Sequence, residues 1–409
     1  MRRSALFALI FLLATNPAAA KIGTIDLVPA STLLVPYFET DFDNPAGVDT
    51  LITVQNASAS ATMVHVTMWT DYGIPTDTFD IYLTGYDQET FSMREIMNRF
   101  LPITASDGQD FGDTSSPNDG ISNQGPISQD INFASCTGQL PGGEDFISAQ
   151  LPLAHMGLAA SDYFGAGNCG GRNYGDGIAR GYVTLDVTNQ CACGATPATV
   201  GYFVNGGGGI AGNRNILLGE VTFLDRTGGR HFTEPAVHIE TSATELNTPG
   251  EYTFYASHVN YTAADNREAL PTAWVGKWAG NRTSAEVWRD PGVPVAAFAC
   301  GGTPFTLNER QIRAYDQDGG VVPATTGNRF PRAAGVTRAG ADLGLVTGWG
   351  SLFLNLNLPA PSGPLSSIRQ SWVTWRQIPR DQPTNSPLGY STHGVQLGNA
   401  NAGDDPVIP

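Results

Sequence analysis

Short stretches in which apolar and polar residues alternate recur from about residue 50 to residue 376. In residues 63–69 (MVHVTMW), Val64, Val66 and Met68 fall on one side of an extended chain, because successive side chains of a strand point to opposite faces. The same alternation predicts strands at residues 50–56, 79–83, 181–187, 200–204, 217–224, 237–240, 252–256, 272–278, 351–358 and 371–376. Many short strands between turns rich in Gly, Asn and Asp predict a mostly β fold.

One segment follows a helical pattern instead. Ser92 and Glu95 have the spacing of a capping box, and Met93, Ile96 and Phe100 recur at intervals that place them on one face of a helix. We therefore expect one short amphipathic helix whose apolar stripe lies in the core.

A seven-residue motif occurs twice. Residues 69–75 (WTDYGIP) and 288–294 (WRDPGVP) share the pattern W-x-D-x-G-[IV]-P, and a Tyr-Asp-Gln triplet follows each, at residues 86–88 and 315–317. The Gly suits a positive φ, the Pro suits the start of a strand, and the Asp can accept bonds from the turn's N–H groups, so each copy predicts a corner between strands. The repeat predicts two tandem β-sandwich units of Ig-like or related type, for which duplication is one origin.

The composition along the chain divides it into five parts. We expect a signal peptide at residues 1–20, a first β-sandwich unit at 21–103, a linker loop rich in Asp, Gly and Ser at 104–130, a second and larger β unit at 131–379, and a polar irregular tail at 380–409. The second copy of the corner would then belong to the larger unit.

The N-terminus has the three parts of a secretory signal. Arg2 and Arg3 give a basic start, residues 5–14 are apolar, and residues 18–20 offer a cleavage site of the A-x-A kind before Lys21. The apolar run is too short to span a bilayer as a helix, and no later stretch reaches the roughly 18 apolar residues that a span requires. We therefore expect an exported protein, periplasmic or extracellular, without a membrane span.

The net charge narrows the range of partners. The full chain has 22 Lys and Arg against 38 Asp and Glu, a formal charge of −16, and loss of Arg2 and Arg3 with the signal would make it −18. Such a chain repels nucleic acid and anionic lipid, so we expect neither as a partner. Only 15% of the residues are charged, whereas Gly and Pro are abundant, as is typical of a turn-rich β protein.

Five cysteines lie in the chain, and in an oxidising compartment disulfides are their expected state. The odd number leaves at least one cysteine without a partner in its own chain. The preferred pairing joins Cys169 to Cys191 or Cys193 across the strand between them, and Cys136 to Cys300, although other pairings stay open. Cys191 and Cys193 have no second cysteine pair or nearby His to complete a zinc site, so we do not expect one.

Two kinds of metal site are open to this sequence. His238 and Glu240 share one face of a predicted strand, and with His258 they would supply two imidazoles and one carboxylate. The alternative is that Val237 and Ile239 face the core while His238 and Glu240 are solvated. Two loops rich in carboxylates suggest a structural Ca²⁺ instead. Their aspartates are Asp41, Asp43 and Asp49 in one loop and Asp107, Asp110, Asp113 and Asp119 in the other.

Motifs of catalysis are weak. Residues 207–212 match the G-x-G-x-x-G pattern of dinucleotide binding, but a strand rather than a helix is predicted to follow, so we expect no dinucleotide there. The chain has no G-x-S-x-G nucleophile motif. The sequence therefore favours a protein without catalytic residues and with no cofactor beyond a structural Ca²⁺.

Five short segments carry a likeness to other proteins: residues 34–38 (LVPYF), 50–56 (TLITVQN), 79–87 (FDIYLTGYD), 287–290 (VWRD) and 298–300 (FAC). Through them the chain resembles a group of exported bacterial β-rich proteins that has no known activity. The resemblance implies a bacterial, exported and β-rich protein, and it transfers no ligand or catalytic residue.

We therefore expect an exported, non-catalytic structural protein of a bacterium that acts as a surface, extracellular-matrix or adhesive component. Its partners would be cell-surface components, matrix components or glycans. Two alternatives belong to other classes: an extracellular hydrolase, metal-assisted through His238, Glu240 and His258, and a module that binds a glycan or another small ligand.

Overall fold

The computed structural model describes most of the chain between residues 27 and 398. The described ranges are 27–102, 147–227, 230–242, 253–260, 262, 264–271, 273–291, 296–302, 306–307, 311–322, 330–338, 344, 347–354, 370–378, 390–393 and 395–398. The expected signal peptide and the expected linker loop at 104–130 lie outside these residues.

Two antiparallel sheets form the first half of the fold. Inner sheet 1 has the strand order β10-β1-β7-β3-β4, and outer sheet 1 has the order β5-β2-β8-β9. Strand β1 contacts β2 and β8, so the two sheets pack face to face as a sandwich. The bounds are β1 (Thr32–Thr40), β2 (Val48–Asn56), β3 (Thr62–Thr70), β4 (Pro75–Leu83), β5 (Gln88–Ser92), β7 (Ala179–Thr188), β8 (Leu217–Asp225), β9 (Arg230–Pro235) and β10 (Val237–Ile239).

Two further antiparallel sheets form the second half. Inner sheet 2 has the order β16-β12-β18-β19, and outer sheet 2 has the order β15-β14-β17-β11-β20. Strand β11 contacts β12 and β18, which makes a second sandwich. The bounds are β11 (Ala273–Ala279), β12 (Thr283–Arg289), β14 (Gln311–Asp316), β15 (Val321–Val322), β16 (Ala334–Arg338), β17 (Thr347–Phe353), β18 (Ser371–Gln377), β19 (Tyr390–His393) and β20 (Val395–Gly398).

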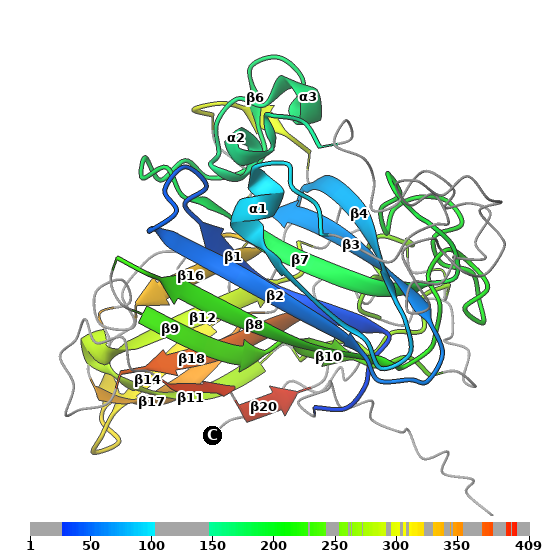
Figure 1. Cartoon of the computed structure of the whole chain (residues 1–409). Helices are drawn as coiled ribbons and strands as arrows, with labels where there is room; N and C mark the ends of the chain where they lie inside the picture. Colours follow the sequence, from blue (N-terminus) through cyan, green and yellow to red (C-terminus); the bar gives the residue numbers. More distant parts are fainter. Residues whose placement is uncertain are drawn as a thin grey trace, which may run out of the picture.

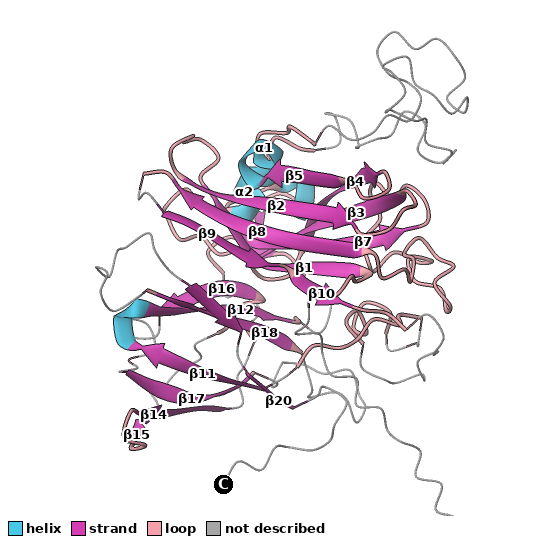
Figure 2. Ribbon diagram, turned by 60° about the horizontal axis from the view of Figure 1, so that its bottom comes forward, coloured by secondary structure: helices cyan, strands magenta, loops and turns pink. Residues whose placement is uncertain are grey.

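The two sandwiches are stacked with their inner sheets facing each other. Strand β1 contacts β12 and β16, and β7 also contacts β16. The four sheets therefore lie in layers, as the two views of the chain show (Figure 1, Figure 2). A small ladder of β6 (Asn168–Cys169) with β13 (Phe298–Ala299) adds a second connection between the halves.

Burial along each strand follows its layer. All nine residues of β3 are buried, whereas buried and less buried residues alternate along β8. A strand in a central layer is covered on both faces, while a strand in an outer layer is covered on one. The sequence of β3 still alternates between apolar and polar residues. Because both faces of this strand are covered, its polar residues His65 and Thr67 are buried as well.

The predicted helix is present, and the described part of the chain contains three further short helical segments. In α1 (Met93–Met97), Ser92 Oγ accepts from the backbone N–H of Glu95 at 3.3 Å, so the capping residue is confirmed. Phe100 is 65% exposed and does not join the predicted apolar stripe. The additions are α2 (Leu151–His155), α3 (Ser161–Phe164) and the 3-10 turn η2 (Gly280–Arg282), which are too short to show a helical period. None of the helices in the described ranges is long and apolar enough to cross a membrane.

The mostly β prediction is confirmed, but the predicted boundaries need correction. Residues 21–103 do not form a sandwich by themselves, because β7, β8 and β10 follow the expected linker and yet pair with β1, β2 and β3. The tail predicted to be irregular contains β19 and β20, which pair with β18 and β11. Local patterns do not encode such distant pairings. The two inner sheets differ in strand order, and duplication stays a prediction.

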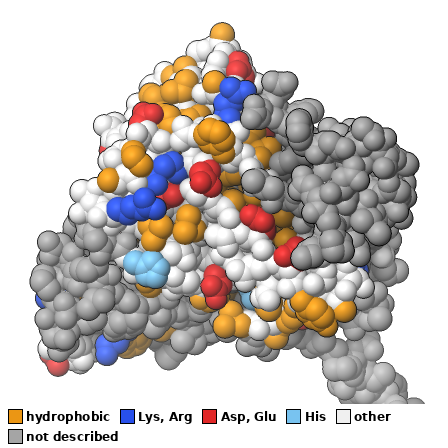
Figure 3. Space-filling model, in the orientation of Figure 1, with side chains coloured by type: hydrophobic (Ala, Val, Ile, Leu, Met, Phe, Trp, Pro, Cys, Tyr) orange, Lys and Arg blue, Asp and Glu red, His pale blue; other side chains and the backbone are white. Residues whose placement is uncertain are grey.

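The outer surface of the first sandwich is mixed in character. On the face that carries β2, β8 and β9, charged side chains of both signs are interspersed with apolar ones (Figure 3). Segment 200–204 and the described residues 253–256 of segment 252–256, both predicted as strands, instead form turns and bends beside the sheets.

Candidate functional site

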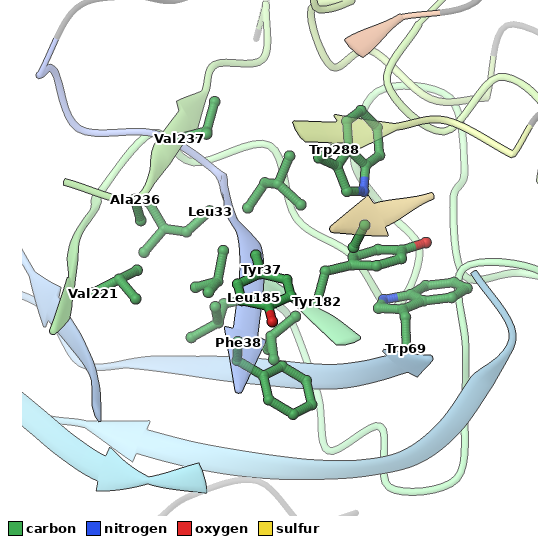
Figure 4. Packing of buried hydrophobic residues seen from close by; sticks show 14 of the residues in the cluster. Leu33, Tyr37, Phe38, Trp69, Tyr182, Leu185, Val221, Ala236, Val237 and Trp288 are labelled. Atoms are coloured by element: carbon green, nitrogen blue, oxygen red, sulfur yellow. The ribbon is translucent and has the colours of Figure 1, made fainter. Parts of the chain in front are cut away.

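The two copies of the repeated corner meet where the inner sheets face each other. Trp69 lies near the end of β3 and Trp288 lies in β12. The ring of Tyr182, from β7, lies between them: it stacks on Trp69 with a centroid distance of 5.6 Å and meets Trp288 edge-on at 6.0 Å (Figure 4). All three side chains are buried. The repeated motif therefore marks the contact between the two sandwiches.

In the first copy the glycine has its expected role, and the aspartate does not. Gly73 has φ 82°, and its N–H donates to the Thr70 carbonyl oxygen at 2.9 Å, which closes the turn. The carboxylate of Asp71 accepts from the backbone N–H of Arg172 at 3.0 Å, in a different loop. The backbone oxygen of Asp71 accepts from the Ala334 N–H at 3.1 Å, which joins this corner to inner sheet 2.

Gly73 also lies against the second copy. A Cβ added to Gly73 would be 2.8 Å from Pro291 Cγ and 3.4 Å from Ala333 Cβ. We expect Gly73→Ala to lower the free energy of unfolding by about 2–4 kcal/mol, because a left-handed backbone strains alanine and the added methyl group overpacks the corner. Urea denaturation of the full chain measures the loss.

Gly175→Ala is a matched control for this substitution. Gly175 has φ 72°, but a Cβ there would meet nothing within 4 Å among the described residues. The control should lose only the backbone strain of about 1–2 kcal/mol. Equal losses in the two variants would contradict a close contact between the corners.

A small cavity lies beside the three rings, at the junction of the sandwiches. The segment 253–260 runs through this junction and supplies Phe254, which stacks on Trp288 at 5.4 Å, and His258, which meets Trp69 edge-on at 5.4 Å. The cavity has room for about one water molecule, which is too little for a substrate. Its walls are formed by Trp69, Tyr182, Thr184, Phe254, Tyr255, His258, Trp288, Asp290 and Pro291.

The polar groups at this cavity do not form a catalytic triad. The Ser257 hydroxyl lies 3.3 Å from His258 Nδ1 and 3.4 Å from Asp290 Oδ1, so the serine sits between the other two groups. A triad needs the histidine in the middle, where it takes the proton of the nucleophile. Burial lowers the pKa of His258, against the opposing effect of Asp290, and keeps its imidazole neutral at pH 7.

The predicted metal residues are not brought together. His238 Nε2 accepts from the Gly219 N–H at 3.2 Å, and its Nδ1 lies 2.8 Å from the Val28 carbonyl oxygen, so both ring nitrogens have backbone partners. Burial lowers the pKa of His238. The described residues, which include His238, Glu240 and His258, contain no group of three His, Cys, Asp or Glu side chains able to hold a metal ion. The alternative expectation, that His238 is solvated while Val237 and Ile239 face the core, is also wrong for His238, because its side chain is buried and only 3% exposed.

The aspartates of the first predicted calcium loop have structural partners. Asp49 is buried and accepts from the Ser92 hydroxyl at 2.7 Å and the Arg94 N–H at 3.0 Å, which fixes the start of α1. Asp41 accepts from the Asn44 N–H at 3.2 Å within its own turn. The other aspartates proposed for calcium, Asp107, Asp110, Asp113 and Asp119, lie outside the described residues, and Asp43 is exposed.

The predicted cysteine pairing is wrong for Cys169 and Cys300. These two residues form a disulfide with a Cα–Cα distance of 5.1 Å. The β6–β13 ladder, in which Phe298 is the partner of Cys169, brings them together, whereas the prediction joined Cys169 to Cys191 or Cys193 and Cys300 to Cys136. Cys191 is disulfide-bonded as well, Cys193 keeps a thiol that donates to Asp80 Oδ2 at 3.1 Å, and Cys136 lies outside the described residues.

Sequence reasoning missed an acidic cluster between the sandwiches. The Arg376 guanidinium contacts Glu286 of β12 and lies 3.3 Å from Glu234 of β9, while it packs 3.9 Å from the ring centroid of Phe223. Burial raises the pKa of Glu286 well above its ordinary value, although Arg376 lowers it. These residues come from three distant segments, so no local signal in the sequence could have grouped them.

Comparison of the chain with protein-family models, with curated proteins and with solved structures finds no match.

Proposed function

We propose that this chain is an exported, non-catalytic structural protein of a bacterium, which acts as a surface, extracellular-matrix or adhesive component. The proposal rests first on how the interior uses its reactive side chains. His65 bonds Asp80 at 2.7 Å and the Ala195 carbonyl oxygen at 2.9 Å. His155 bonds the Arg180 carbonyl oxygen at 3.0 Å and lies 2.9 Å from the Thr76 hydroxyl.

Through these contacts the imidazoles of His65 and His155 hold neighbouring segments of the chain together. A general base or a metal ligand needs one ring nitrogen that faces a substrate or an ion. In His65, His155 and His238 both nitrogens instead bond neighbouring protein groups. This is the observation that favours a scaffold over an enzyme.

Export is supported by two independent features. The basic, apolar and small-residue parts of residues 1–20 have the order of a secretory signal. The Cys169–Cys300 disulfide joins the two halves of the fold, and such bonds persist in oxidising compartments.

The proposal is tested by locating the protein in the producing cell. We expect fractionation to recover a chain that begins at Lys21 in the cell-surface or matrix fraction, and immunogold labelling to place it outside the cell. A known periplasmic protein, followed in the same fractions, controls for leakage. Recovery of the chain as a monomer in the periplasm would contradict a surface or matrix role.

Measuring the metal content of the purified protein distinguishes the metal-assisted hydrolase from the non-catalytic structural protein. A stoichiometric transition metal that is lost in His238→Ala and retained in His231→Ala would overturn the non-catalytic proposal. His231 is a suitable control because it is exposed near the start of β9.

A further inference from the structure

Two buried glutamates from different sandwiches share one arginine in the acidic cluster. Arg376 Nη2, from β18, donates to Glu286 Oε2 of β12 and to Glu234 Oε1 of β9, the latter at 3.3 Å. Glu286 is fully buried, and Glu234 is 3% exposed. The cluster therefore joins inner sheet 2 to outer sheet 1, across the boundary between the two sandwiches.

The charges at this boundary do not balance when every group is ionised. Glu39 of β1 adds a third carboxylate that acts on Glu286, and it accepts from the Tyr37 hydroxyl at 2.9 Å. Arg376 supplies one positive charge against these three carboxylates. An uncompensated charge in a protein interior is costly, and a carboxyl group in that position usually takes up a proton.

The other elements packed around Glu286 do not supply the missing positive charge. Its cross-strand partners are Val336 of β16 and Thr374 of β18, neither of which is charged. Arg180 of β7 brings a cation to this region, but its Nη1 and Nη2 atoms bond Asp176 at 2.9 and 2.6 Å. The negative excess therefore stays with the carboxylates.

Each of the two glutamates has one oxygen atom for which the described residues supply no donor. These buried atoms are Glu286 Oε1 and Glu234 Oε2, and the two side chains lie within hydrogen-bonding reach of each other. A proton would supply the missing donor, because a protonated carboxyl group donates one bond and still accepts others. Burial raises the pKa of Glu286 well above its ordinary value, the charges of Glu234 and Glu39 raise it further, and Arg376 lowers it.

We propose that Glu286 is protonated at neutral pH and donates to Glu234, and that this hydrogen bond is a pH-sensitive latch between the two sandwiches. When the proton leaves, two adjacent carboxylates face one guanidinium, and their repulsion weakens the contact of β9 with β12 and β18. The latch does not depend on the surface or matrix function proposed above, since it concerns only how the two halves of the fold are held together.

The direction of the pH effect follows from the shift of this one group. A glutamate in the unfolded chain ionises near about pH 4.3, whereas Glu286 in the folded protein ionises at a much higher pH. The stability that the latch contributes is therefore complete below about pH 4.3 and is lost as the pH rises through the pKa of Glu286 in the folded protein.

Urea denaturation of the full chain and of Glu286→Gln, at a series of pH values from pH 5 to pH 8, tests the latch. Glutamine keeps an acceptor for Arg376, donates to Glu234 at every pH and cannot ionise. Until Glu286 ionises, we expect the unfolding equilibrium constant of the unaltered chain to rise about tenfold per pH unit relative to that of the variant, because unfolding releases one proton. Glu220→Gln, at an exposed position of β8, is the matched control and should stay within about twofold of the unaltered chain.

Two further measurements use the folded protein. Infrared spectra at pH 7.5 should contain the C=O stretching band of a protonated carboxyl group, which Glu286→Gln lacks and Glu220→Gln keeps. Hydrogen exchange, compared between the unaltered chain and Glu286→Gln at the same pH so that intrinsic rates cancel, should be faster in β9 and β12 of the unaltered chain at pH 8.5. Exchange in β3 and β4 should be equal in the two proteins.

Each outcome decides the proposal. An unaltered chain without a protonated carboxyl band at pH 7.5 would overturn it, and so would the same pH dependence of unfolding in the unaltered chain and in Glu286→Gln. Faster exchange spread equally over β3, β4, β9 and β12 would show a general loss of stability and overturn the latch. The infrared spectrum of the unaltered chain needs no variant, so the proposal stays testable even where Glu286→Gln does not fold.

Discussion

Replacing Arg267 with methionine is expected to lower the free energy of unfolding by about 3–5 kcal/mol, because it leaves buried carboxylates without their cationic partner. Arg267 is 1% exposed. Its Nε lies 3.3 Å from Asp186 Oδ1 of β7, and its Nη1 lies 3.4 Å from Asp265 Oδ1. Urea denaturation of the full chain at pH 7 measures the loss.

The electrostatics of this triad explain the size of the effect. Burial alone would lower the pKa of Arg267, but the charges of Asp186 and Asp265 outweigh it and raise the pKa above its ordinary value. Burial raises the pKa of Asp265, and Arg267 opposes that shift. Without the guanidinium, each carboxylate must take up a proton or remain as an uncompensated buried charge.

The position of Arg267 adds a structural consequence. Its segment connects β10 of the first sandwich to β11 of the second, and its Nη2 donates to the Gly212 carbonyl oxygen at 3.2 Å. Loss of the side chain would therefore release the connector from inner sheet 1 as well as unbalance the charges.

Two variants control this prediction. Arg226→Met removes an exposed arginine whose long contact with the Pro45 carbonyl oxygen, at 3.5 Å, is weak, and it should change stability by no more than about 0.5 kcal/mol. Arg267→Met combined with Asp265→Asn should recover part of the loss, because one of the unpaired charges is gone. A loss below about 1 kcal/mol in Arg267→Met would contradict a tightly coupled triad.

Strand β8 of outer sheet 1 was predictable from the sequence, because its residues alternate between a buried face and a less buried one. The segment 217–224 was predicted, and β8 spans Leu217–Asp225. The turn at 200–204 shows where the same rule fails. Its aromatic residues Tyr202 and Phe203 are buried against the sheet from a loop, so burial in a loop produced the apolar pattern that elsewhere marks a strand.

The repeated corner could be recognised in the sequence, but the contact between its two copies could not be predicted. Both motifs could be assigned to corners from their Gly and Pro residues, and Gly73 has the expected positive φ. That the copies touch depends on the stacking of the inner sheets, which brings Pro291 against Gly73. Arg332, far along the chain, then reaches Asp71. Contacts of this length have no local signature, so the pairing of Arg332 with Asp71 could not be predicted.

For the disulfide, the sequence predicted that such a bond forms but not which cysteines it joins. Cysteines in an exported chain predict disulfides, but pairing follows strand registers, and Cys169 sits in a ladder with the segment that leads to Cys300. The pair closes a loop with a sequence separation of 131 residues. A crosslink over so long a loop restricts the unfolded chain strongly.

Replacing both cysteines with serine is therefore expected to lower the free energy of unfolding by about 4–5 kcal/mol, measured by urea denaturation of the full chain. The double variant is preferable to chemical reduction, because Cys191 is disulfide-bonded as well and would be reduced at the same time. Cys193→Ser is the matched control: serine keeps a donor for Asp80, and the crosslinks are untouched, so the change should stay within about 1 kcal/mol.

The same bond makes folding depend on the compartment. Expressed without residues 1–20 in a reducing cytosol, the chain should be no more stable than the double variant, because the disulfide of Cys191 is absent there as well, whereas the exported chain should retain the full value. If the double variant unfolds at the same urea concentration as the unaltered chain, the β6–β13 ladder and the packed inner sheets hold the halves together without the crosslink. The Cys169–Cys300 bond would then have no part in joining the two sandwiches.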